Sequence, residues 1–380
     1  MANEKFYNDL VQNIEGQYRE CKGYRLLCKT QNFSPYSNLK TKSDLKDVPF
    51  LVTTLFKKSN KLYPKLLRVN SENLTKWTIS SSTTGDPSVV GRTENDMAEL
   101  QKVITLSSDA LKPRYGYDCI FFPEPYTMRT YHSENLLGKP TESYIGNVLN
   151  SFQFSDETEF LLKKADDGFY LDTDEFIRFL QHHDNKNQSV SIRGSTLLLY
   201  NTIQTLKKNI PPFHLGSKAI IHTGGGGWDG KKGSISIGKQ IMRSQFVQEV
   251  SDFLGIPPKN FIDTYSFTEN SIPITGHYSE KYEDYLFHVP QWSAVLLRNV
   301  KTLEVLNHPG DKGFIEVLNA YGTSAFAGAS VLVDDLAELI DPEKCPDCGY
   351  KGMTIRILGR VKGSEAKGCG ATLNVRSEKS

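Results

Sequence analysis

The sequence predicts an α/β fold, and three observations support this class. Runs of apolar and β-branched residues alternate with segments of helical periodicity between residues 117 and 265. Within this stretch, a short apolar run at 218–223 leads through glycines into an amphipathic segment at 239–254, which is the pattern of a βαβ unit. Beyond Pro290 the chain changes to short apolar runs without helical spacing, which indicates a small β-rich lobe.

Each element is expected from its own local signals. Residues 3–28 are expected to form a helix because Phe6, Leu10, Val11 and Ile14 follow helical spacing. Residues 47–57 contain an early proline, Pro49, and continue with β-branched residues, so an extended segment or a buried turn is expected there. The expected strands are 74–79, 117–122, 195–200, 218–223, 260–265, 293–297, 313–318, 330–333 and 353–358. The expected helices after the first are 145–164, 173–183 and 239–254, and the last of these ends before Gly255 and Pro257.

Bulk composition describes an ordinary globular protein. With 380 residues, 38% apolar residues and 23% charged residues, the chain can form one large domain with lobes or two domains. A formal net charge of +1 without basic blocks argues against a dedicated nucleic-acid binder. No signal peptide or run of eighteen apolar residues is present, and six cysteines are too few for a disulfide framework. A cytoplasmic protein with free thiols and no membrane span is expected.

A hydroxyl-rich loop follows the predicted strand 74–79. It consists of Ser80, Ser81, Ser82, Thr83 and Thr84 and closes on Gly85, Asp86 and Pro87. Such a loop offers several side-chain donors and exposed backbone N–H groups with little steric bulk, so it suits a polyphosphate. The alternative interpretation is a Ser/Thr-rich surface linker.

A glycine run forms the second candidate site. The residues Gly224, Gly225, Gly226 and Gly227 lead to Gly230 and Lys231 with the spacing of a P-loop. A P-loop needs a hydroxyl after the lysine to hold Mg²⁺, and Lys232 occupies that position. The preferred interpretation is a loop over which adenine lies, and the alternative is a flexible connection.

The predicted strand 260–265 ends at Tyr265, the first residue of the segment Tyr-Ser-Phe-Thr-Glu at 265–269. At the carboxyl edge of a sheet, Tyr265 would offer a flat ring, Thr268 a donor to a phosphate oxygen and Glu269 a ligand for Mg²⁺. Further along, Asp335 follows a short apolar strand and could accept both hydroxyls of a ribose. Arg360 ends the last predicted strand, where its guanidinium could contact a phosphate or ribose oxygen. A solvated turn and a surface arginine are the alternatives for these last two.

The cysteines near the C-terminus suggest two kinds of chemistry. Cys345 and Cys348 have zinc-knuckle spacing, but with only Cys369 nearby they cannot form a closed Cys₄ site, so zinc would need a distant histidine or carboxylate. Cys369 is flanked by glycines and preceded by Lys367, which favours an accessible thiolate nucleophile. The alternative for Cys369 is an inert thiol in a flexible tail.

Taken in order, these motifs resemble those of the adenylate-forming superfamily. The supporting segments are S-S-S-T-T-G-D-P at 80–87, the glycines at 224–227, Y-S-F-T-E at 265–269, D-L-A at 335–337 and G-R at 359–360. Within that superfamily the chain is most similar to the LuxE-like acyl-protein synthetases, related to phenylacetate-CoA ligases. The residues that narrow the resemblance are V-P-F-L-V-T-T-L-F-K at 48–57, C-x-x-C-G at 345–349 and G-R-V-K-G-S-E-A-K-G-C at 359–369.

The resemblance implies an architecture. The large N-terminal domain of adenylate-forming enzymes would cover residues 1–358, with mixed and parallel sheets flanked by helices, a helical cap over about 1–60 and a β-rich lobe over about 290–358. Residues 359–380 would form a much-shortened C-terminal tail carrying Cys369. The family's catalytic lysine of the mobile C-terminal domain then has no counterpart.

The sequence also departs from the family pattern. Ser82 replaces the central glycine of the hydroxyl loop, Ser266 and Phe267 replace the G-x of Y-G-x-T-E, and Asp334 replaces the glycine before the ribose aspartate. Of these departures, Ser82 is the one that bears on the activity of the hydroxyl loop.

The resemblance implies an enzyme that uses ATP and Mg²⁺ to convert a carboxylic acid, a long-chain fatty acid in this family, to an acyl-adenylate. The acyl group would pass to Cys369 and then to a partner reductase subunit. Transfer to coenzyme A or a carrier protein is the first alternative, and a non-catalytic nucleotide-binding module is the second.

Overall fold

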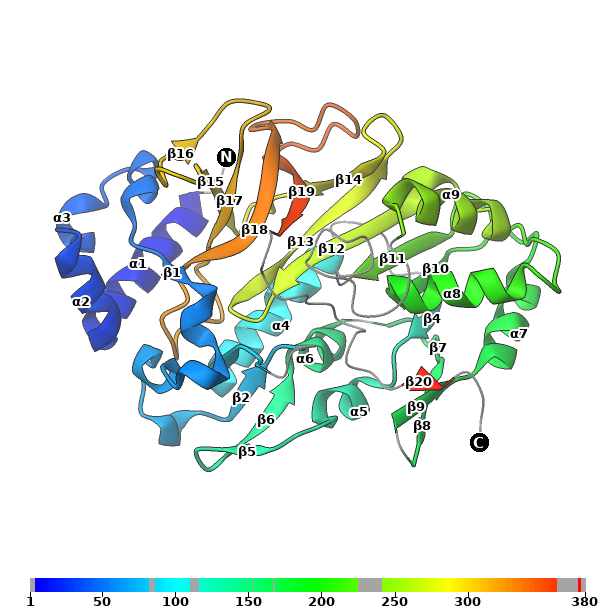
Figure 1. The fold of residues 1–380 in the computed structure, drawn as a ribbon, viewed down its shortest axis with the longest axis horizontal. Helices are drawn as coiled ribbons and strands as arrows, with labels where there is room; N and C mark the ends of the chain where they lie inside the picture. The colour runs from blue at the N-terminus through cyan, green and yellow to red at the C-terminus, as the bar shows by residue number, and fades with distance from the viewer. Residues whose placement is uncertain are drawn as a thin grey trace.

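The computed structural model describes residues 4–81, 86–109, 116–152, 154–166, 168–224, 241–360 and 375–376. In this part of the chain a large twisted sheet runs through the molecule, with helices at both ends (Figure 1). In the view of Figure 1 the helices α1, α2 and α3 lie at the left end of the molecule, and α7, α8 and α9 lie at the right end. The helices are α1 (Glu4–Glu20), α2 (Lys22–Thr30), α3 (Pro35–Asn38), α4 (Glu94–Asp109), α5 (Pro125–Thr130), α6 (Tyr144–Ser151), α7 (Thr173–His183), α8 (Thr196–Leu206) and α9 (Arg243–Leu254).

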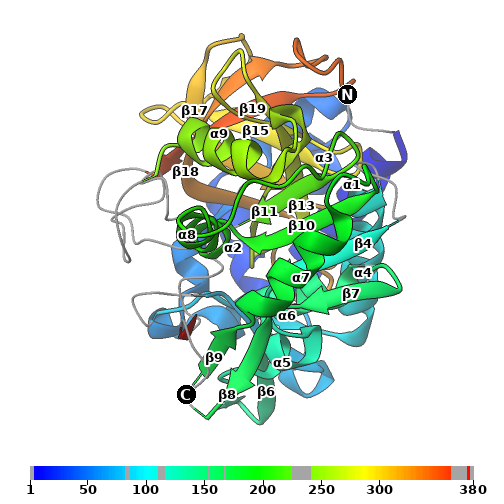
Figure 2. The same cartoon turned by 90° about the vertical axis from the view of Figure 1, so that its right-hand side faces the viewer.

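The large sheet has a parallel half and an antiparallel half. Its strands follow the order β16 (Val305–Leu306), β15 (Ala294–Arg298), β17 (Lys312–Leu318), β18 (Ser330–Asp341), β19 (Thr354–Arg360), β14 (Asp284–His288), β13 (Asn270–Ser279), β12 (Phe261–Phe267), β11 (Ile220–Gly224), β10 (Val190–Ser195), β4 (Tyr117–Phe121) and β7 (Glu157–Phe160). The strands β12, β11, β10, β4 and β7 are parallel, and the pairs from β12 to β16 are antiparallel. In Figure 2, β10 and β11 run between α9 above and α7 below.

Smaller sheets complete the fold. One contains β3 (Val89–Arg92), β2 (Lys76–Ile79), β6 (Lys139–Ser143) and β5 (Asn135–Leu136), and another contains β20 (Val375–Arg376), β9 (Gly168–Leu171) and β8 (Leu162–Ala165). β1 (Leu51–Val52) pairs with β18. The expected β-rich stretch beyond Pro290 is therefore present as β15 to β19, and its strands continue the large sheet. None of the described helices is long and apolar enough to cross a membrane.

Several expected elements are wrong in type or extent. The run 195–200 is not a strand: β10 ends at Ser195, whose hydroxyl caps α8 by accepting from Leu198 N at 3.5 Å. Short apolar runs are ambiguous between strand and helix, and here the serine cap decides. The helix expected at 145–164 ends at Ser151 and gives way to β7 and β8. The N-terminal helix is divided at Cys21 into α1 and α2.

Candidate active site

The hydroxyl loop connects the two strands of a hairpin. β2 and β3 pair in antiparallel register with Ile79 opposite Val89. Beyond this pair, Ser80 N donates to Ser88 O at 3.0 Å and Ser88 N donates to Ser80 Oγ at 2.8 Å. The hairpin therefore fixes where the loop leaves and re-enters the sheet. Ser81 is described, whereas Ser82, Thr83, Thr84 and Gly85 lie outside the described residues.

Asp86, where the chain leaves the hydroxyl loop, is held by Lys57 and Ser59. Asp86 accepts hydrogen bonds from Ser59 N at 2.8 Å and from Ser59 Oγ at 2.7 Å. Lys57 Nζ donates to Asp86 O at 2.7 Å. The expected extended segment or turn at 47–57 contains β1, which is followed by a 3₁₀ turn over Thr53–Phe56. This segment thus positions Lys57 beside the loop.

Thr268 and Glu269 form the two-residue turn between β12 and β13. Phe267 pairs with Asn270 across this turn, and Thr268 and Glu269 are 2% and 1% exposed. Glu269 Oε1 is buried and has no hydrogen-bond partner among the described residues. A buried carboxylate oxygen without a donor is costly unless a cation or solvent compensates it, so this atom is a candidate ligand.

A buried arginine that the sequence analysis missed holds this turn. Arg92, at the end of β3, donates from Nη2 to Thr268 O at 2.8 Å and from Nη1 to Gly322 O. Its guanidinium lies 5.1 Å from the ring centroid of Phe326. Burial lowers the pKa of Arg92, while the charges of Asp96 and Glu269 oppose that shift. In the sequence, Arg92 is recognisable only as one arginine in the otherwise apolar strand V-V-G-R, and this pattern does not indicate which residues it contacts.

Three expected nucleotide-binding residues from distant motifs meet at β12, β18 and β19. The hydroxyl of Tyr265 donates to Asp335 Oδ2 at 2.8 Å, and Arg360 Nε donates to Asp335 Oδ1 at 3.0 Å. Arg360 Nη2 also lies 3.4 Å from Asp334 Oδ1. Burial and the Asp335 carboxylate raise the pKa of Tyr265. Although burial opposes it, the carboxylates of Asp335 and Asp334 raise the pKa of Arg360.

The strand that carries Asp335 is longer than expected. The sequence predicted a short strand that ends near Asp335. This prediction is wrong, because β18 continues from Ser330 to Asp341 and Asp335 lies within it. Asp335 pairs with Arg360 in the sheet, and the register shifts between Leu336 and Ala337. An irregular ladder of this kind changes the direction in which neighbouring side chains point. Asp335 and Arg360 are thus brought together by strand pairing.

An apolar pocket adjoins these motifs. Its polar lining includes Arg193, His222, Thr264 and Ser266, and Gly224 also lines it. The apolar lining consists of Ile120, Phe122, Ile145, Val148, Leu149, Phe152 and Phe154. Thr264 and Ser266 flank Tyr265, so the pocket lies next to the strand that contributes Tyr265. Gly225 and Gly226 lie outside the described residues.

His222 is the second polar residue that sequence reasoning missed. It lies on β11 in the apolar run I-I-H-T, and its Nε2 is 2.8 Å from Thr264 Oγ1. Burial, together with the charge of Arg193, lowers the pKa of His222 to about 3. The ring is therefore neutral at pH 7, so the apolar pocket contains a hydrogen-bonding group without a charge.

The structure separates the cysteine candidates. Cys345 and Cys348 lie in the turn between β18 and β19, where His277 and His288 approach them. Both cysteines are free thiols. Cys369, the expected acyl acceptor, lies outside the described residues.

The sequence matches the family model described as acyl-protein synthetase, LuxE, over residues 2–377. No curated protein matches it. Among solved structures, the fold is similar to that of a 2-hydroxyisobutyryl-CoA ligase in complex with 2-HIB-AMP and CoA, with a TM-score of 0.64 and 15% identity over 95% of this chain and 68% of the ligase chain. An open conformation of that ligase gives a TM-score of 0.62 at 13% identity, covering 93% of this chain and 74% of the ligase chain.

These comparisons agree with the resemblance and the fold expected from the sequence. At such low identity, the likeness to the CoA ligase shows the fold, and it is the expected fold of the large domain of adenylate-forming enzymes. The family match covers nearly the whole sequence and includes each of the expected motifs. The chain therefore belongs to the LuxE family of acyl-protein synthetases, and it is an acyl-adenylate-forming ligase.

Proposed function

We propose that this protein activates a long-chain fatty acid with Mg²⁺-ATP and transfers the acyl group to its own Cys369. In the first step a carboxylate oxygen of the acid attacks the α-phosphorus of ATP, and pyrophosphate leaves with the electron pair of the broken P–O bond. In the second step the Cys369 thiolate attacks the acyl carbonyl carbon, and AMP leaves as the thioester forms. Adenylation replaces a strongly basic leaving oxide with a good leaving group.

The observation that carries the proposal is the convergence of Tyr265, Asp335 and Arg360. In the proposed complex, Asp335 binds the ribose hydroxyls and Arg360 contacts the α-phosphate or ribose. The Tyr265 hydroxyl holds Asp335 by the 2.8 Å hydrogen bond, so the carboxylate meets the nucleotide in a fixed orientation. The expected contact between adenine and the Tyr265 ring, or the glycines from Gly224 to Gly226, stays a prediction.

The phosphates would lie between the hydroxyl loop and the Thr268 turn. Ser80 Oγ already accepts a hydrogen bond from Ser88 N, so we assign its role to shaping the loop. The donors from Ser81 to Gly85 would bind the β- and γ-phosphates, and Thr268 would donate to the α-phosphate. Arg92 connects the hairpin of the loop to the Thr268 turn. This contact would keep the two proposed phosphate-binding segments in a fixed position relative to each other.

The chemistry of Glu269 fits Mg²⁺. Its buried Oε1 lacks a hydrogen-bond partner in the described chain, and Mg²⁺ binds through one or two carboxylates together with substrate phosphates. When bound, the ion would neutralise charge on the phosphates of ATP. The turn that carries Glu269 is fixed by Arg92, so the carboxylate needs little reorganisation to bind a cation.

The apolar pocket is the proposed acyl site. Its hydrophobic walls match an alkyl chain, whose transfer from water is favourable by about 0.8 kcal/mol per buried CH₂. Gly224 and Ser266 place one side of the pocket next to the proposed nucleotide site. The activated carboxylate could therefore lie by the α-phosphate while the chain extends between α6 and β10.

The acceptor is tested by mass spectrometry of protein incubated with ATP, Mg²⁺ and a fatty acid. We expect an acyl adduct on the peptide that contains Cys369, and hydroxylamine should cleave it, as it cleaves a thioester, to a hydroxamate and the free thiol. Cys369→Ala should abolish the adduct while keeping acid-dependent ATP–pyrophosphate exchange. Cys28→Ala, which removes a buried thiol of α2, is the control and should keep both.

Other outcomes would identify a different acceptor. Acyl-CoA formation by Cys369→Ala at the wild-type rate would overturn the transfer to Cys369 and favour a CoA ligase. No exchange across a broad panel of acids would overturn acid activation and favour a nucleotide-binding module. The reductase partner is tested separately, by measuring transfer of a labelled acyl group from this protein to an acyl-accepting reductase subunit.

A further inference from the structure

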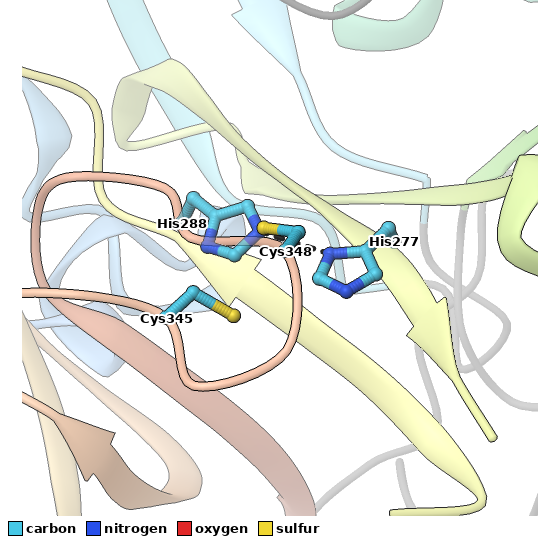
Figure 3. Close-up of side chains that lie close together, drawn as sticks. All are labelled: His277, His288, Cys345 and Cys348. Atoms are coloured by element: carbon cyan, nitrogen blue, oxygen red, sulfur yellow. Dashed lines mark hydrogen bonds between the residues drawn. The ribbon is translucent and has the colours of Figure 1, made fainter. Parts of the chain in front are cut away.

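Four side chains that can bind a metal converge away from the proposed nucleotide site. They are His277, His288, Cys345 and Cys348, and their ligand atoms all lie within 4.8 Å of one another. His277 comes from β13 and His288 from β14, while the two cysteines come from the turn between β18 and β19 (Figure 3). Only the cysteine pair could be recognised in the sequence. His277 and His288 could not, because the hairpin that carries them meets the turn only in the folded chain.

The two histidines present suitable nitrogens to each other and to the cysteines. His277 Nδ1 lies 3.0 Å from His288 Nε2, and Cys348 Sγ lies 3.4 Å from the same His288 nitrogen (Figure 3). The two imidazole rings are stacked, with centroids 5.1 Å apart. The arrangement therefore brings ring nitrogens and sulfurs together, and not ring carbons.

The outer nitrogen of each histidine has its own partner. His277 Nε2 lies 2.8 Å from Asp347 Oδ2, and His288 Nδ1 lies 3.2 Å from Thr354 Oγ1. Metal-binding histidines usually use one nitrogen for the metal and the other for a carboxylate, carbonyl or hydroxyl that fixes the ring orientation. Both histidines of the cluster follow this pattern.

The backbone of the turn holds the cysteines on the same side. Cys345 N donates to Tyr350 O at 2.8 Å, and Gly349 N donates to Cys345 O at 3.1 Å. Gly349 has φ +76, a conformation that favours glycine. Two cysteines separated by two residues in a tight turn can both reach one ion.

We propose that His277, His288, Cys345 and Cys348 bind one structural Zn²⁺ through His277 Nδ1, His288 Nε2 and the two thiolates. A tetrahedral zinc ion with Zn–S of about 2.3 Å and Zn–N of about 2.0–2.1 Å requires ligand atoms about 3.3–3.8 Å apart. The separations of 3.0 Å between His277 Nδ1 and His288 Nε2 and of 3.4 Å between Cys348 Sγ and His288 Nε2 are close to this requirement, so small side-chain shifts complete the site.

Four protein ligands leave zinc no open position, so its role is structural. The ion would join the β13–β14 hairpin to the turn between β18 and β19. Those same strands contribute Asp335 and Arg360, while the Thr268–Glu269 turn lies at the other end of β13. Zinc would therefore stabilise the packing of the sheet that positions these side chains, without contacting ATP.

Metal analysis of the full chain is the direct test. The protein is expressed with added Zn²⁺, any affinity tag is removed, and the dialysed protein is analysed by plasma mass spectrometry. We expect about one zinc per chain. Less than about 0.1 zinc per chain, another tightly bound metal, or a Cys345–Cys348 disulfide in the metal-free protein would overturn the proposal.

Cobalt substitution and variants test the ligand set. Co²⁺ in the wild-type protein should give the visible bands of a tetrahedral ion and a thiolate charge-transfer band, whereas octahedral spectra would contradict the site. Cys348→Ser, at an exposed position, and His277→Gln should lose zinc or change the cobalt spectrum. His308→Gln and Cys28→Ala, outside the cluster, should keep one zinc. Zinc retention by Cys348→Ser with an unchanged cobalt spectrum would exclude this ligand set even if Cys345→Ser failed to fold.

Discussion

The Tyr265 hydroxyl and the Asp335 carboxylate form a buried hydrogen bond of 2.8 Å between residues that are 70 positions apart. The acceptor is the residue to which we assign the ribose, and Arg360 occupies its other oxygen at 3.0 Å. Both contacts restrict how the carboxylate can rotate. The nucleotide site proposed here is therefore assembled before ATP binds.

Tyr265→Phe should weaken ATP binding more than it slows the reaction. A hydrogen bond to a charged group contributes about 1.5–3 kcal/mol, so we expect the KM for ATP to rise about tenfold with little change in kcat. Steady-state pyrophosphate-exchange kinetics measure both constants. Tyr7→Phe is the control, because it removes a buried hydroxyl that has no hydrogen-bond partner within the described part of the chain. Equal effects of the two substitutions would refute the positioning role.

Glu269→Gln should separate activity from stability. The substitution keeps the side-chain shape but removes the charge that we assign to Mg²⁺, so the exchange rate should fall about 100-fold. The free energy of unfolding should change by less than about 1 kcal/mol, because Oε1 accepts no hydrogen bond from any of the residues that the structure describes. Exchange assays across a Mg²⁺ titration and urea unfolding measure the two effects. An unchanged Mg²⁺ dependence would exclude Glu269 as a ligand.

His222→Gln should reduce the acid sensitivity of the fold. The pKa of His222 is about 3 in the folded protein, below the value of about 6.5 in the unfolded chain. The unfolded state therefore takes up a proton first as pH falls, and the histidine's contribution to stability, fully present above about pH 6.5, decreases toward pH 3.

This linkage can be measured by urea unfolding at pH 7 and pH 5. Between these pH values the wild type should lose up to about 2 kcal/mol more stability than His222→Gln. His308→Gln, at an exposed loop position, is the control and should behave like the wild type. A pH dependence that is identical in His222→Gln and the wild type would contradict a lowered pKa of the His222 ring.

Val148→Phe should change acid selectivity. Val148 lines the apolar pocket from α6, and a larger ring there removes volume that a long alkyl chain would occupy. We expect the ratio of exchange rates for long over short acids to fall about tenfold. Asn150→Ala, on the exposed face of the same helix, should leave that ratio unchanged. Equal losses for all acids would place the acyl chain elsewhere.

The local parts of the candidate site could be predicted from sequence. The strand before the hydroxyl loop is β2, and the expected break after Tyr265 is the turn at Thr268 and Glu269. Glycine, proline and small hydroxyl residues report turn geometry within a few positions, so these features need no tertiary information.

The remaining parts depend on contacts between distant segments. Arg92 was missed because its partners, Thr268 O and Gly322 O, are backbone atoms that leave no trace in residue type. His277 and His288 lie on paired strands, and their meeting with Cys345 depends on where the turn after β18 folds back. The error at 195–200 has a local origin, since T-L-L-L-Y satisfies either strand or helix until the cap at Ser195 is recognised.

The contacts of Arg92 have a consequence for interpreting random mutagenesis. Because its guanidinium joins β3, the Thr268 turn and the Gly322 carbonyl, replacing it would alter two segments of the proposed nucleotide site at once. A screen scored only by product formation would therefore group Arg92 with the residues that touch ATP. Assays at saturating ATP would distinguish Arg92 variants from variants of residues that contact ATP directly. A higher ATP concentration can compensate for the loss of a direct contact, whereas it cannot correct a misplaced turn.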